Sequence, residues 1–143
     1  MIESNEDIWN YWGKKGHIVV ITTNNEGDSR GFLIMGKSIA LEAKNRIPNL
    51  PKQMSPYVGA RYLTVNWPKD GVLCLQTKYL WRDKSPMELV QDSIQRLGEI
   101  ALRDEETVFH TVRPACGNGG RDWEKEIKPL CQEWPNNIVV HHV

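Results

Sequence analysis

The chain has 143 residues, of which 40% are hydrophobic and 25% are charged, and its eighteen basic residues balance eighteen acidic ones. This length favours one globular domain with a real core, and the neutral balance excludes binding of nucleic acid through overall charge alone. Cys74, Cys116 and Cys131 fit no metal-ligand spacing, and no apolar run reaches the roughly 18 residues of a membrane-spanning helix. We therefore expect a cytoplasmic protein with reduced thiols and no membrane association.

The first half of the chain begins its regular structure with a β-branched run at 17–23, which predicts a strand covered on both faces. The polar segment at 24–31 predicts a loop. Apolar residues at helical spacing then predict a helix that starts near Gly36 and stops before Pro48. Three prolines predict irregular chain over 48–60.

The middle of the chain predicts a hairpin and a long helix. Two β-prone runs, at 61–67 and 72–77, flank a turn at 68–71 that ends in Asp-Gly, so the sheet should be mixed. Residues 85–88 have the pattern of a capping box with proline at the first helical position. An apolar stripe over 87–101 predicts the helix that follows.

The last third predicts a strand, a glycine-rich loop, a helix and a closing strand. The strand covers 107–113 and the loop covers 116–120. Asp122 is a candidate N-cap for a helix that ends near Trp134, and 138–143 reads as the final strand. Strands that alternate with helices around a hairpin predict a three-layer α/β/α fold with a mixed central sheet.

Two small-residue loops lie where strands give way to helices, at 36–38 and 116–120. Glycine brings no Cβ and the first N–H groups of a helix are unpaired, so such loops can hold a phosphate. Ligands of open α/β sheets bind outside the carboxyl ends of the strands, where Asn24 and Lys78 are also expected. The set therefore predicts a cleft for a diphosphate with an attached ribose, although a glycine cluster can also be only a tight turn.

Several single residues keep two interpretations at this point. Lys78 is either a pocket lysine or a solvated one, Asp122 is either an acid or only a helix cap, and Cys116 is either a nucleophile or loop packing. Tyr79 and Trp81 face either the cleft, where they could stack on a ring, or the core.

The whole chain, 1–143, resembles a single macro domain, the ADP-ribose-binding α/β/α module. The matching segments follow the family's order and cover nearly the entire sequence: 7–9, 20–24, 35–40, 77–85 and 114–123. Residues 77–85 are most similar to a branch that includes ADP-ribose-1''-phosphate phosphatase-like proteins. They are also similar to macro-domain antitoxins that remove ADP-ribose from DNA.

This resemblance implies a role for each matching residue. Asp7 would accept a hydrogen bond from the adenine amino group with Ile8 beside it, and Asn24, after Thr23, would face the distal ribose. The first phosphate loop would comprise Met35, Gly36, Lys37, Ser38 and Ile39, and the second would comprise Cys116, Gly117, Asn118, Gly119 and Gly120. In glycohydrolase-type members a lysine at the position of Lys78 acts at the anomeric carbon, so Lys78 and Asn24 are the expected catalytic residues. No cofactor and no metal is implied.

Three positions depart from the family's pattern. Ser38 stands where glycine is usual, and Glu6 replaces the usual glycine before Asp7. Gly119 stands where one branch has a catalytic aspartate, so the mechanism that pairs this aspartate with the lysine does not carry over.

We therefore expect a monomeric domain that binds ADP-ribose, ADP-ribose-1''-phosphate or an ADP-ribosylated macromolecule, and that hydrolyses a phosphate or linked group from the distal ribose. One alternative is a reader or sequestering module that binds ADP-ribose without turnover. Another is a nucleotide-binding domain for a different dinucleotide.

Overall fold

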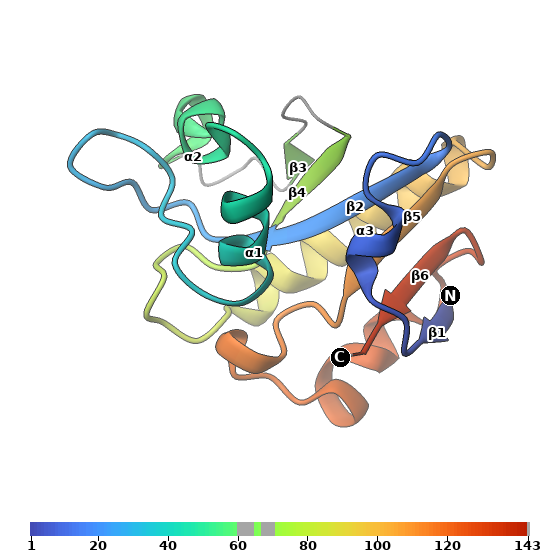
Figure 1. Ribbon diagram of the computed structural model, residues 1–143. Helices are drawn as coiled ribbons and strands as arrows, with labels where there is room; N and C mark the ends of the chain where they lie inside the picture. Colours follow the sequence, from blue (N-terminus) through green and yellow to red (C-terminus); the bar gives the residue numbers. More distant parts are fainter. Residues whose placement is uncertain (60–64, 67–70, 143) are drawn as a thin grey trace.

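The computed structural model describes residues 1–59, 65–66 and 71–142, and it shows a mixed sheet with helices on both faces (Figure 1). Within this part of the chain the sheet has six strands in the order β1-β6-β5-β2-β4-β3. Strand β3 is antiparallel to β4, and all other neighbouring strands are parallel. The strands are β1 (Ile2–Ser4), β2 (His17–Thr23), β3 (Val65–Asn66), β4 (Val72–Gln76), β5 (Val108–Val112) and β6 (Ile138–His141).

The helices lie in two layers, with α1 and α3 on opposite sides of the sheet (Figure 1). The α-helices are α1 (Ser38–Arg46), α2 (Leu50–Gln53) and α3 (Met87–Arg103). Shorter segments with 3-10 or π geometry are η1 (Ile8–Tyr11), η2 (Ser55–Tyr57), η3 (Gly117–Gly119), η4 (Trp123–Ile127) and η5 (Lys128–Cys131). This arrangement confirms the predicted three-layer fold.

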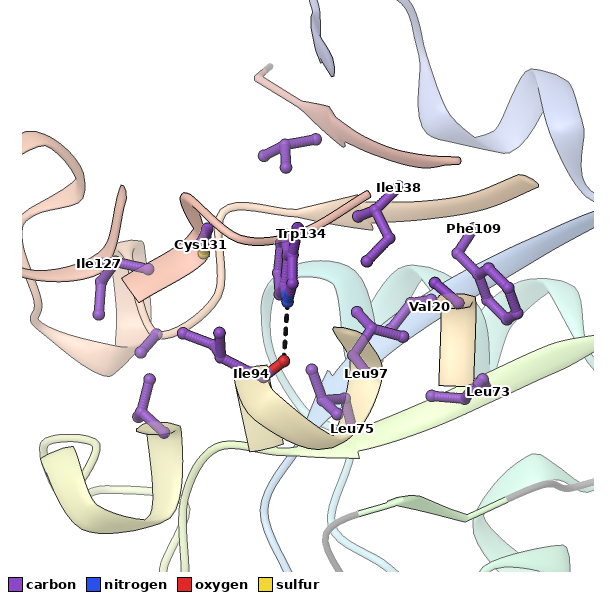
Figure 2. Close-up of a cluster of buried hydrophobic side chains, with 14 of the residues drawn as sticks. Val20, Leu73, Leu75, Ile94, Leu97, Phe109, Ile127, Cys131, Trp134 and Ile138 are labelled. Atoms are coloured by element: carbon purple, nitrogen blue, oxygen red, sulfur yellow. Dashed lines mark hydrogen bonds between the residues drawn. The ribbon is translucent and has the colours of Figure 1, made fainter. Parts of the chain in front are cut away.

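Alternation along the strands divides the core into two clusters. In β2, Val20 faces α3 while Val19 and Ile21 face α1, and all three are fully buried. The α3 side is closed by Trp134, whose indole Nε1 donates a 2.7 Å hydrogen bond to the carbonyl oxygen of Ile94 (Figure 2). A buried indole with a satisfied N–H contributes large apolar area without an unpaired polar group, which fixes α3 against the C-terminal segment.

The predicted strand at 17–23 is confirmed to the residue, and the helix between Gly36 and Pro48 is confirmed as α1. The antiparallel pair of β3 and β4 agrees with the predicted hairpin. The rest of its first strand and residues 68–70 of its turn lie outside the described residues.

Three local predictions were wrong. Residues 48–60 contain α2 and η2, because a proline in the first turn of each is compatible with helical geometry. The capping box is absent: Pro86 is the N-cap of α3, and the Ser85 hydroxyl is buried with no hydrogen-bond partner among the described residues. The predicted final helix consists of the short segments η4 and η5, because Pro129 lacks the N–H that a continuous helix needs.

In the described part of the chain, no helix combines the length and the apolar character needed to cross a bilayer.

Candidate ligand-binding site

A cavity of about 750 Å³ opens at the carboxyl ends of the central strands. Its floor includes Thr23 at the end of β2, Thr77 after β4, Val112 at the end of β5 and His141 at the end of β6. This edge of an open α/β sheet is where ligands bind, because loops and helix starts gather there.

Most residues expected at a ligand site line this one cavity. They are Asp7, Ile8, Thr23, Asn24, Gly36, Lys37, Ser38, Ile39, Lys78, Cys116, Gly117, Asn118 and Gly119. Two expected residues do not line it: Met35 is buried beneath the first loop, and Gly120 lies beside the side chain of Lys84. Ligand contacts for the whole set stay a prediction.

The first loop forms the start of α1 in an unusual backbone conformation. Ser38 has a φ of 53°, in the left-handed region that favours glycine. Lys37 is the N-cap of α1 and makes no side-chain capping bond, so its side chain leaves the first N–H groups of the helix uncapped. A Cβ added to Gly36 would meet nothing within 4 Å, so the loop is open at this point. This backbone geometry explains why glycine would suit the position of Ser38.

The second loop also depends on left-handed backbone. Ala115 has a φ of 61° and Gly117 a φ of 74°, which folds the chain into the short segment η3. The main-chain N–H of Arg121 donates to the carbonyl oxygen of Ala115 at 3.0 Å and closes the loop. Glycine and small residues keep Cβ atoms out of the cavity along this wall.

Lys78 lies inside the cavity wall with only 9% of its surface exposed. Its ammonium nitrogen Nζ donates a 3.1 Å hydrogen bond to the carbonyl oxygen of Trp81. Burial and then the positive charge of Lys37 lower the pKa of Lys78, while Asp83 opposes this shift. The solvated interpretation of Lys78 is wrong, and a lowered pKa favours an amine that can lose its proton.

Asn24 lines the cavity, but its amide is engaged by the loop that follows β2. Nδ2 donates to the carbonyl oxygen of Ile34 at 3.0 Å, and Oδ1 accepts from the N–H of Glu26 at 3.0 Å. The Asn24 side chain therefore holds the loop. Only one of its amide hydrogens remains for a ligand, which limits the chemistry that Asn24 can perform at the site.

The remaining open interpretations resolve toward structural roles. Asp122 is the N-cap of η4, where its Oδ2 accepts from the N–H of Lys125 at 2.7 Å, and it does not line the cavity. Cys116 does line it, but burial raises the pKa of its thiol to about 11. A protonated thiol is a poor nucleophile, which favours the packing interpretation of Cys116.

Sequence reasoning left the position of Trp81 open and missed other residues of the lining. Trp81, which is 41% exposed, faces the cavity, and the Lys37 ammonium lies 5.7 Å from the centre of its ring. The position of Trp81 three residues after Lys78 indicated this in the sequence. Of the two interpretations left open for Trp81, the structure supports the cleft and not the core. Glu42 from α1 and Arg113 from the end of β5 also line the cavity, as do Asn5, Thr22, Ile34, Ala40, Thr77, Val112, Ala115, His141 and His142.

Across the residues that the structure describes, no three histidine, cysteine or acidic side chains are arranged to hold a metal ion.

No family model matches the sequence, and no curated protein matches it significantly. Solved structures do match it over almost its whole length. The macrodomain of Thermus aquaticus DarG aligns with a TM-score of 0.72 and 21% identity over 99% of this chain and 97% of that one. The macrodomain of Mycobacterium tuberculosis DarG aligns with a TM-score of 0.73 and 21% identity over the same shares.

A third match is Thermosipho africanus DarTG in complex with ADP-ribose, with a TM-score of 0.71 and 14% identity over 95% of this chain and 39% of that one. At sequence identities this low, the structural matches show a shared fold and nothing about activity. The chain therefore has the macrodomain fold.

Proposed function

We propose that the domain binds ADP-ribose, free or as the 1''-phosphate or attached to a macromolecule, in the cavity at the strand ends. The cavity's volume of about 750 Å³ falls in the range of small-molecule sites. A structure with the same fold, Thermosipho africanus DarTG, is in complex with ADP-ribose, which supports this choice of ligand.

The two loops provide the groups that a diphosphate needs. The start of α1 offers main-chain N–H groups without a side-chain cap, and the second loop offers a wall with few Cβ atoms. Asp7, which also lines the cavity, is exposed, and its Oδ1 caps η1 by accepting from the N–H of Trp9 at 3.0 Å. We expect its Oδ2 to accept a hydrogen bond from the adenine amino group.

We further propose that Lys78 makes the domain a hydrolase, and its buried amine with a lowered pKa is the observation that carries this. The Nζ lone pair attacks C1'' of the distal ribose while the bond from C1'' to the linked atom breaks. The leaving group departs with its electron pair and takes up the proton that the alkylated Nζ loses. Water then cleaves the Lys78 adduct and frees the amine. A Lys78 that stays protonated would instead stabilise negative charge on the leaving group.

The first test is calorimetry with ADP-ribose, NAD and AMP. Tighter binding of ADP-ribose than of AMP is expected, because AMP lacks the second phosphate that the two loops would hold. Weaker binding of NAD is also expected, because NAD carries nicotinamide on the distal ribose, where Lys78 and the second loop would leave no room for it. Equal affinity for NAD would indicate a site for another dinucleotide.

The second test is turnover of ADP-ribose-1''-phosphate and of ADP-ribosylated DNA and protein by the wild type and by Lys78→Ala. The substitution should abolish turnover and leave ADP-ribose binding within a few fold, and the exposed Lys44→Ala on α1 is the matched control. Absence of turnover in the wild type would defeat the hydrolase proposal.

One observation favours a binding module instead. Among the described residues that line the cavity, the carboxylates are Asp7 and Glu42, and neither comes from the second loop. A site that relied on a carboxylate there to activate water would be incomplete. In that case neither the wild type nor Lys78→Ala turns over any of the three substrates while both bind ADP-ribose.

A further inference from the structure

Three histidine side chains are joined end to end on the η1 side of the sheet. Nδ1 of His17 lies 2.9 Å from Nε2 of His110, and Nδ1 of His110 lies 2.8 Å from Nε2 of His141. His110 and His141 are each 2% exposed, and His17 is half-buried. The hydrogen bonds make the three rings one unit, which we call the histidine chain.

The histidine chain crosses the sheet diagonally toward the cavity. His17 begins β2 and is level with Val108 of β5, whereas His110 lies two residues farther along β5. His110 is level with Val139 of β6, and His141 again lies two residues farther. The histidine chain therefore starts at the edge of the sheet opposite the cavity and ends at His141, which lines the cavity.

The last acceptor fixes the direction of every hydrogen bond. Nδ1 of His141 lies 2.9 Å from the main-chain carbonyl oxygen of Glu6, which can only accept. Nδ1 of His141 therefore carries the proton, and its bare Nε2 accepts from Nδ1–H of His110. By the same logic His17 donates through Nδ1 to His110. Each neutral ring has one tautomer, so the imidazole orientations are locked.

Groups around the histidine chain favour the same neutral tautomers. Tyr11 stacks on His110 with ring centres 3.9 Å apart, and its hydroxyl donates to the Glu6 carboxylate at 3.0 Å. The Lys14 ammonium lies 5.2 Å from the centre of the Tyr11 ring. Burial, followed by charge on His141, His17 and Lys14, lowers the pKa of His110 to about 4. His110, the middle residue of the histidine chain, is therefore uncharged at neutral pH.

The contact with Glu6 connects the histidine chain to the site. Glu6 is held at its carbonyl by His141 and at its carboxylate by Tyr11. The next residue is Asp7, which lines the cavity and caps η1. The Glu6–Asp7 peptide has little freedom to rotate while both contacts persist, and that peptide sets the direction of the Asp7 carboxylate.

We propose that His141, oriented by His110 and His17, is a positioning residue that determines base specificity by fixing the Glu6–Asp7 peptide at the base end of the cavity. This inference rests on the proposed function, since Asp7 reads the exocyclic amino group of the base. Loss of the His141–Glu6 contact loosens Asp7 and weakens the preference for an amino-substituted purine.

Two substitutions at one position separate the two contacts of His141. His141→Asn places an amide nitrogen where Nδ1 was and restores donation to Glu6. His141→Gln places an amide oxygen where Nε2 was and keeps acceptance from His110, but it leaves Glu6 without a donor. The two variants thus remove the same ring and differ in which contact survives.

Calorimetry compares ADP-ribose with inosine diphosphate ribose, in which a carbonyl oxygen replaces the adenine amino group. The wild type should prefer ADP-ribose by about tenfold or more, since a hydrogen bond to a charged group is at stake. His141→Asn should keep this preference. His141→Gln should reduce it toward unity through weaker binding of ADP-ribose, with affinity for the inosine analogue changed less than about twofold.

The outcomes are distinguishable. A purely structural role would weaken both ligands equally in His141→Gln, and that result overturns the inference while the proposed function stands. Wild-type protein that binds neither ligand overturns both. If the variants do not fold, nitrogen-15 NMR of the wild type decides. The inference requires Nδ1–H at His141 and a larger shift of that signal with ADP-ribose than with the inosine analogue, and any other tautomer or equal shifts overturn it.

Discussion

The main-chain N–H of Ser85 donates a 2.9 Å hydrogen bond to the carbonyl oxygen of Gly119, and this bond joins the segment after Lys78 to the second loop. The Ser85 side chain also packs against the Cα of Gly119, on the side where another residue would have its Cβ. A Cβ added to Gly119 would lie 2.7 Å from Oγ of Ser85 and 3.2 Å from Cβ of Ala115. The walls of the cavity thus meet at a contact that has no room for one more carbon atom.

Gly119→Ala should destabilise the protein by about 1–3 kcal/mol, because overpacking forces the backbone of the second loop to shift. Affinity for ADP-ribose should fall as well, since this loop lines the cavity. Gly36→Ala is the control, because its Cβ would meet nothing within 4 Å. Urea unfolding of both variants measures the effect, and equal free energies of unfolding would contradict the tight contact.

Ser85 offers a second test of the same contact. Its hydroxyl is buried without a partner among the described residues, so Ser85→Ala should leave the free energy of unfolding unchanged or raise it slightly. The same substitution should partly rescue Gly119→Ala, because it removes the atom at 2.7 Å. A double-mutant cycle gives the coupling energy, and additive effects would show that Ser85 is not the obstacle.

The backbone at Ser38 should carry strain that glycine relieves. A φ of 53° disfavours residues with a Cβ, and Ser38→Gly should stabilise the protein by roughly 0.5–1 kcal/mol after allowing for the freer unfolded chain. Asn49→Gly is a matched control at a φ of 60° outside the cavity, where asparagine tolerates this conformation and little change is expected. Thermal and urea unfolding would reveal no difference between the two if strain at Ser38 were absent.

Much of the fold was predictable because its signals are local. The β-branched run at 17–23 and the apolar spacing after Gly36 each specify an element through neighbouring residues. The capping box at Ser85 failed for a nonlocal reason: that side chain packs against Gly119, more than thirty positions away in sequence. Local pattern cannot register such a contact.

The candidate site divides in the same way. Loops marked by glycines and the position of Lys78 were visible in sequence, whereas Asn24 gave no sign that Ile34 and Glu26 engage its amide. The histidine chain was invisible, because His17, His110 and His141 meet only through the register of three strands. Their spacing along the sequence gives no sign of this contact.

The charges around Lys78 should move its pKa in opposite directions. Lys37→Gln removes a positive neighbour and should raise the pKa of Lys78, while Asp83→Asn removes a negative one and should lower it. Carbon-13 NMR of reductively methylated lysines follows the titration directly, without relying on catalysis. Lys44→Gln, on the outer part of α1, should cause no shift, and a shift of the same sign in Lys37→Gln and Asp83→Asn would contradict this account.

The histidine chain should make stability depend on pH in a defined window. The pKa of His110 is lowered from 6.5 to about 4 in the folded protein, mainly by burial. Between these values the unfolded chain binds the proton and the folded protein does not, so stability is fully present above about pH 6.5 and declines as pH falls toward 4. The loss should approach roughly 3 kcal/mol for an uncoupled site.

Urea unfolding at pH 7.5, 6.5 and 5.5 isolates this effect, because carboxylates such as Glu3 and Glu126, whose pKa values are lowered from 4.5, titrate mostly below pH 5.5. His110→Gln should flatten the dependence between pH 7.5 and 5.5, although it lowers stability overall by leaving His17 and His141 with weaker partners. His142→Gln makes the same chemical change at an exposed ring outside the histidine chain and should keep the wild-type slope. If His110→Gln retained that slope, the folded protein would have to accept a proton at His110 as readily as the unfolded chain does, and the uncharged histidine chain would not be its native state.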